Sequence, residues 1–216
     1  MAFMGVFSFL AARFNYPAVL DGPADTVLPQ LLATGGAGRA VWAFYAFLPL
    51  IWIPAGVGGY LMLRRSHPGA MLLALQCAAL AAIAMMLGLM RWPSIHWHLA
   101  EAYVNASPDQ RVVLTSVFDG LNTYLGNYVG EFLGELSFNA FILLSGYVLW
   151  RAKAATRWVA VTVVITGVAG LIGMFRNLTP LVAPVAAIDN YVLPLGMIVL
   201  GVVFLRYRGP DTPAVS

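Results

Sequence analysis

Long apolar runs alternate with short polar segments along most of this chain. Residues 40–63 carry no charged side chain and end at Arg64 and Arg65. A helix of this length measures about 36 Å, enough to cross the hydrocarbon core of a bilayer. Pro49 and Pro54 predict a local break inside it, because proline removes a helical hydrogen bond. With four further mostly apolar runs, the pattern predicts transmembrane spans at residues 40–63, 68–90, 128–150, 158–175 and 185–205.

The segments between these spans are expected to lie outside the bilayer core. Residues 1–13 are apolar but too short to cross alone, and they predict a sixth, shorter N-terminal membrane element. Residues 14–39 are predicted to be external, and residues 93–127 to form external or interfacial helices. Within the latter, Ser107 and Pro108 suit an N-cap and a first helical position. No strong break follows, so one long helix is expected to run from this point into the span at residues 128–150.

The composition indicates that lipid, not water, surrounds most of this chain. Apolar residues make up 61% and charged residues only 10%, whereas soluble domains carry about 25% charged residues. The net charge of +3 and the single cysteine exclude a nucleic-acid binder and a disulfide framework. We therefore predict a single domain over residues 1–216, an all-α integral membrane protein. Its helical bundle has five transmembrane helices plus the short N-terminal element.

Basic residues predict the orientation in the membrane, because cytoplasmic loops are enriched in Lys and Arg. Arginine or lysine residues follow three alternate spans, at residues 64–65, 151–157 and 206–208. These segments lie on one side by alternation. The pattern predicts a multi-pass protein of the bacterial inner membrane with a cytoplasmic C-terminus and the lipid bilayer as its main partner.

A polar stripe follows the long helix if each residue turns it by 100°. Counted up from Trp150, Asn139 lies about 16 Å, Glu135 about 22 Å and Glu131 about 28 Å along the axis. The stripe is thus expected to descend from the outer surface toward mid-membrane. Its members are Tyr124, Asn127, Tyr128, Glu131, Glu135 and Asn139.

Other spans place polar groups at similar heights. Asp189 lies about 24 Å above Leu205, and Arg176 about 27 Å above Trp158. Ionisable residues in lipid are costly and usually face a partner or a cavity. One interpretation is that Arg176 neutralises carboxylates and joins helices. The other is an outward-opening pocket in the outer leaflet, with Glu131 and Glu135 as catalytic acid/base groups and a ligand held by Asn127, Tyr128, Asn139, Arg176, Asn177, Asp189 and Asn190.

Such a pocket would bind a small, mostly apolar molecule or a lipid. If the protein is an enzyme, isomerase or cyclase chemistry fits best, and no cofactor is expected, because no dinucleotide-binding, phosphate-binding or CxxC motif occurs. A Gln variant of Glu131 or Glu135 is then expected to lose activity or ligand binding. A proton-coupled carrier is one alternative, although the stripe fades below Asn139 and carriers need access from both sides. An accessory subunit of a membrane complex is another.

Three glycines spaced four residues apart lie beside the polar stripe. Gly126, Gly130 and Gly134 form the small-xxx-small pattern that lets another helix approach closely. They are candidates for a homo-oligomer contact or for docking a partner.

Two histidines in the external segment raise the question of a metal site. His98 and Glu101 would share a helical face, while His96 and His98 would point apart on a helix. We expect no metal, with His96, His98 and Glu101 as the weaker candidate ligands. The alternative is that they are ordinary interfacial residues.

Three stretches resemble a known family. They are NYPAVL at residues 15–20, the Gly35–Gly36 pair and, above all, FDGLNTYLGNYVGEFLG at residues 118–134. Together with Arg157–Trp158 they resemble the bacterial multi-pass membrane family catalogued as domain of unknown function 4386. The resemblance covers most of the chain and implies a fold and a membrane location, but no substrate or activity.

Overall fold

The computed structural model describes residues 2–206, without the side chains of residues 2–4 and 21. Arg208, part of the basic tail used to predict orientation, lies outside the described residues. Within residues 2–206 every regular element is helical. In chain order the elements are α1 (Ala2–Phe14), η1 (Ala18–Asp21), α2 (Ala24–Ala33), α3 (Gly35–Phe47), η2 (Leu48–Ile51), α4 (Trp52–Leu63), α5 (Pro68–Met90), η3 (Trp92–His96), α6 (Trp97–Val104), α7 (Pro108–Leu121), η4 (Asn122–Leu133), α8 (Gly134–Arg151), α9 (Arg157–Gly173), η5 (Met174–Asn177), η6 (Pro180–Val182) and α10 (Ala183–Arg206).

Several of these elements join end to end into helices of membrane-crossing length. Among residues 2–206, five continuous helices are long and apolar enough to span a bilayer, and the stretch Gly5–Phe14 is a shorter apolar helix. The fold class predicted from the apolar runs is thereby confirmed. The five helices are Gly35–Leu63, Pro68–Val104, Pro108–Arg151, Arg157–Asn177 and Pro180–Arg206.

The first of these helices changes its winding where proline predicts a break. α3 ends at Phe47, and the chain tightens into the 3₁₀ turn η2 before α4 begins at Trp52. Pro49 lies in that turn, and Pro54 lies in the first turn of α4, where its missing N–H costs little.

The long helix begins as its sequence predicts. The Ser107 hydroxyl accepts a hydrogen bond from the Gln110 amide, and the Gln110 side chain accepts one from the Ser107 amide. This capping box satisfies two amide groups that a helix start leaves open. The helix then continues to Arg151, but residues Asn122–Leu133 are π-helical. A π-helix bonds i to i+5 and turns less per residue, so the rotation of 100° per residue assumed for the polar stripe does not hold over η4.

The chain divides into two compact units. Unit 1 comprises residues 1–49 and 84–131, and unit 2 comprises residues 50–83 and 132–216. Unit 1 has an aromatic core in which α1 contributes Leu10 and Phe14, α3 contributes Trp42, and η3 begins with Trp92. The Phe14 ring meets those of Trp42 and Trp92 edge-on at 5.7 and 5.4 Å, and Trp42 stacks on Trp92 at 5.1 Å.

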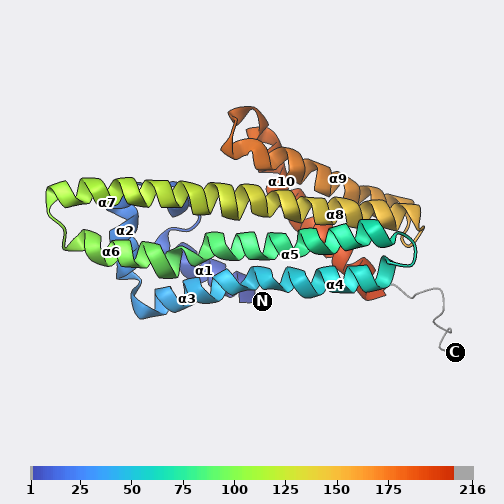
Figure 1. Ribbon diagram of the computed structural model, residues 1–216, viewed down its shortest axis with the longest axis horizontal. Coiled ribbons are helices and arrows are strands. Elements are labelled where there is room, and N and C mark those ends of the chain that lie inside the picture. The colour runs from blue at the N-terminus through green and yellow to red at the C-terminus, as the bar shows by residue number, and fades with distance from the viewer. Residues whose placement is uncertain (1, 207–216) are drawn as a thin grey trace. The chain divides into compact units, whose positions relative to one another are not determined.

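Unit 2 is built on close helix contacts. In Figure 1 α8 runs beside α9. Two of the glycines at this contact lie against the backbone of the facing helix. A Cβ at Gly146 would lie 2.9 Å from the Val164 nitrogen, and one at Gly167 would lie 2.7 Å from the Leu143 nitrogen. Such close approach of backbones is typical of helices packed in membranes.

Candidate functional site

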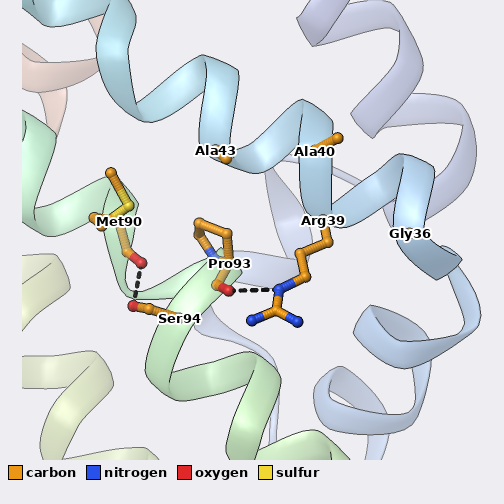
Figure 2. A pocket seen from close by; sticks show the side chains of 7 residues that line it. All are labelled: Gly36, Arg39, Ala40, Ala43, Met90, Pro93 and Ser94. Atoms are coloured by element: carbon orange, nitrogen blue, oxygen red, sulfur yellow. Dashed lines mark hydrogen bonds between the residues drawn. The ribbon is translucent and has the colours of Figure 1, made fainter.

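A groove lies in unit 1 between α3 and the start of η3. Its volume is about 380 Å³, within the range of small-molecule pockets. Gly36, Ala40 and Ala43 form one face of α3 at intervals of four and three residues, and their small side chains leave the space open. The other lining residues are Arg39, Met90, Pro93 and Ser94 (Figure 2).

Arg39 supplies the charge at this groove. Its Nε donates a 2.9 Å hydrogen bond to the Pro93 carbonyl, and its Cζ lies 5.3 Å from the centre of the Trp97 ring. These two contacts fix the guanidinium plane. Among the side chains that the structure describes, its two terminal nitrogens have no hydrogen-bond partner, and Figure 2 shows them at the end of the side chain that points away from α3. The groove therefore pairs an apolar lining with one oriented cation.

A buried polar network lies elsewhere in unit 1. Arg91 is only 6% exposed, and its Nε donates to the Asn122 Oδ1 at 3.0 Å. Its guanidinium also bonds the Gly88 carbonyl and lies 5.0 Å from the Trp92 ring centre. Asn122 in turn donates from its amide nitrogen to the Leu20 carbonyl at 2.9 Å. Asn122 thus joins η4, the end of α5 and the N-terminal segment.

Asn122 should accordingly matter for stability. In Asn122→Ala, Arg91 loses one acceptor and the Leu20 carbonyl loses its donor, and an unmade buried hydrogen bond costs about 1–3 kcal/mol. We expect a loss of about 1–2 kcal/mol, measured by equilibrium unfolding in mixed detergent micelles. Asn105→Ala is the matched control, because Asn105 is exposed, and its change should stay within about 0.5 kcal/mol. Equal losses in the two variants would contradict this role.

Two tyrosines and Glu131 belong to the same unit. The hydroxyls of Tyr16 and Tyr45 lie 3.2 Å apart. Burial raises the pKa of Tyr16 above its usual value, its hydrogen bond with Tyr45 lowers it, and the charges of Glu131 and Arg91 act on it in opposite directions. Glu131, predicted as an acid/base group, therefore lies within electrostatic range of Tyr16.

The second predicted carboxylate, Glu135, lies in unit 2 and is paired. Arg176 donates from its two terminal nitrogens to the two Glu135 oxygens at 2.6 and 2.7 Å. This fork joins α8 to η5. Asp189 on α10 interacts electrostatically with both Glu135 and Arg176. Its Oδ1 is buried without a hydrogen-bond partner among the described residues. The structure thus brings Glu135, Arg176 and Asp189 together, as their predicted heights suggested.

The remaining predicted ligand residues are placed differently. Asn139 is 1% exposed, donates to the Glu135 carbonyl at 2.9 Å and lies directly against Gly170, so it packs α8 on α9. Asn190 is exposed. Asn127 and Tyr128 lie in η4 of unit 1, and Asn177 follows Arg176 in η5.

Two of the three spaced glycines pack within the chain. A Cβ at Gly126 would lie 2.7 Å from the Arg91 guanidinium, and one at Gly130 would lie 3.0 Å from the Gly88 Cα. Gly134 is buried in unit 2. The homo-oligomer expected from this pattern stays a prediction.

The candidate metal ligands do not converge. His96 is fully buried, with its ring 4.8 Å from that of Trp92 and 4.7 Å from that of Phe118. His98 is exposed, and Glu101 accepts a 2.9 Å hydrogen bond from the Trp97 indole. Across residues 2–206, no three His, Cys, Asp or Glu side chains are grouped so that they could hold a metal ion.

Sequence reasoning did not single out the residues that line the groove of unit 1 or those of the Arg91 network. The sequence by itself assigns no role to Arg91 or Trp92, and Arg39, Ala40 and Ala43 form no recognisable motif. A lone arginine that closes an uncharged run was the one available signal for Arg91. For the groove, the small residues at intervals of four and three beside Arg39 were the signal.

No curated protein and no solved structure matches this chain. A family model described as "Domain of unknown function (DUF4386)" matches residues 1–207, which is nearly the whole chain. The membrane-spanning helices agree with the family suggested by the motifs at residues 15–20 and 118–134. This chain therefore belongs to the DUF4386 family of membrane proteins.

Proposed function

We propose that this protein is a multi-pass protein of the bacterial inner membrane that binds a small, mostly apolar molecule in the groove of unit 1. The observation that carries the proposal is the groove itself, about 380 Å³ in volume and lined mainly by Gly36, Ala40, Ala43, Met90 and Pro93. Apolar walls with a few polar groups are typical of small-molecule sites. A molecule already dissolved in the bilayer reaches such walls without crossing water.

The orientation of the chain in the membrane follows from its basic residues. Basic residues follow alternate spans, at Arg64 and Arg65, at residues 151–157 and at Arg206. Because cytoplasmic loops are enriched in Lys and Arg, this pattern favours a cytoplasmic C-terminus. The groove lies at the N-terminal end of α3, at the opposite end of that helical stretch from Arg64. It then opens at the outer leaflet.

Binding fits the groove better than acid/base catalysis does. A general acid or base must reach its substrate within hydrogen-bond distance, and none of the described lining residues is a carboxylate, histidine or cysteine. Glu135 is engaged by Arg176 at both oxygens. Glu131 stays the acid/base candidate of unit 1, and isomerase chemistry would have to use it.

Filling the groove should abolish binding. In Ala43→Phe an aromatic ring would occupy the space along α3, and we expect at least about a tenfold loss of binding, equivalent to about 1.4 kcal/mol. The probe is a photoreactive diacylglycerol, and the readout is labelling of the peptide that contains Met90 and Pro93. Ala37→Phe is the control, because Ala37 is exposed on the same helix and does not line the groove. Undiminished labelling in Ala43→Phe would refute the proposal.

A further inference from the structure

We infer that the groove of unit 1 holds an anionic phospholipid, with its phosphate on the Arg39 guanidinium and an acyl chain along Ala40, Ala43 and Met90. This inference rests on the proposed function and specifies the class of the bound molecule. The apolar binding site then has a charged group, Arg39, that selects anionic lipids over neutral ones.

The charge of Arg39 is positioned for a phosphate group. Its Nε is held by the Pro93 carbonyl at 2.9 Å, and its guanidinium stacks over the Trp97 ring at 5.3 Å. The two terminal nitrogens have no partner among the described side chains, and they can donate to two phosphate oxygens, the fork geometry for which arginine is suited. Because the side chain is already ordered, little conformational freedom is lost when the anion binds.

No acidic side chain competes for this guanidinium in the described part of the chain. Glu101 contacts the same tryptophan as Arg39, but its carboxylate accepts a 2.9 Å hydrogen bond from the Trp97 indole N–H. No ion pair joins it to Arg39 within residues 2–206. Arg39 is exposed, so its positive charge is open to a group from outside the chain, and an anionic headgroup supplies the opposite charge.

The apolar lining of the groove is suited to an acyl chain of the lipid. Gly36, Ala40 and Ala43 have small side chains or none, so they leave space along one face of α3. The flexible Met90 side chain also lines the groove. Arg39 lies where the first apolar run begins, so the charged end meets the membrane surface while the lining extends toward lipid. A molecule with one anionic end and a long apolar chain matches both parts at once.

The test uses the full-length protein in detergent and native mass spectrometry with two added lipids. Dioleoyl phosphatidylglycerol carries a phosphate, and dioleoylglycerol has the same chains without it. We expect the wild type to prefer the phospholipid about tenfold and Arg39→Gln to lower that preference to about one. Arg39→Lys should keep part of it, because the charge remains but the fork is lost.

The matched control is Arg111→Gln. Arg111 lies in the same unit, and its Cζ is also 5.3 Å from an aromatic ring centre, that of Tyr103, but it does not line the groove. This variant should keep the tenfold preference. If Arg39→Gln also keeps it, or if inorganic phosphate alone competes as well as the phospholipid, the inference is overturned.

Ala43→Phe separates this inference from the proposed function. Loss of both lipids in Ala43→Phe, together with an unchanged preference in Arg39→Gln, would leave the binding groove standing and reject the anionic lipid. Unchanged binding of both lipids in Ala43→Phe would reject the groove and the lipid together. Loss of both lipids in Ala43→Phe with loss of preference in Arg39→Gln supports both.

Discussion

Gly88→Leu should destabilise the protein more than any other substitution considered. A Cβ at Gly88 would lie 2.6 Å from the Gly130 Cα and 3.0 Å from the Leu125 carbonyl oxygen. Both neighbours are backbone atoms, so no side chain can rotate away and the helices must separate. Overpacking costs about 1–3 kcal/mol where side chains can adjust, and we expect about 3 kcal/mol or more here.

Side chains of increasing size at Gly88, with a control at another glycine, test whether the loss comes from the contact between Gly88 and Gly130. Gly88→Ala should lose less than Gly88→Leu, because one methyl group needs a smaller separation. Gly201→Leu is the control, since a Cβ at Gly201 meets nothing within 4 Å, and its unfolding free energy should change by less than about 0.5 kcal/mol. Equilibrium unfolding in mixed detergent micelles measures all three variants. Equal losses for Gly88→Leu and Gly201→Leu would show that the close approach does not carry stability.

Arg176→Met should produce the second large loss. It leaves Glu135 without its bidentate partner, and breaking a buried ion pair costs about 3–5 kcal/mol. The two side chains are 34% and 24% exposed, so we expect a smaller loss of about 2–3 kcal/mol. The double variant Glu135→Gln with Arg176→Met should be more stable than Arg176→Met alone, because no unpaired carboxylate remains.

The same series decides between the two interpretations of Glu135. If the pair joins α8 to η5, Glu135→Gln lowers stability and leaves lipid binding in unit 1 unchanged. If Glu135 serves a bound molecule, the variant loses binding and keeps its stability. Arg157→Met is the control, because Arg157 is exposed at the other end of α9. Its stability should stay within about 0.5 kcal/mol of the wild type.

Features that depend on neighbouring residues were predictable from the sequence. Ser107 and Pro108 marked a helix start, Pro49 and Pro54 marked a change of winding, and the uncharged runs marked helices of membrane-crossing length. Heights along separate helices also suggested that Glu135, Arg176 and Asp189 lie together. Each of these inferences needs only local propensity, residue spacing or helical rise.

Features that depend on packing between distant segments were not predictable. Asn122 bonds to Arg91, 31 residues away, and to Leu20, 102 residues away, and no pattern in the sequence specifies such pairs. The π-helical winding of η4 changes which residues share a face without a distinct residue signature. One wall of the groove is lined by glycine and alanine at intervals of four and three residues, and this spacing does not specify which segment forms the opposite wall.

We propose that unit 1 binds a lipid-like molecule between α3 and η3. A structure determined experimentally from protein in a lipid mesophase containing phosphatidylglycerol tests it most directly. We expect continuous density along Ala40, Ala43 and Met90 that ends in a phosphate beside Arg39. A groove closed by side-chain packing, or an Arg39 guanidinium paired with a carboxylate of the protein itself, would contradict it.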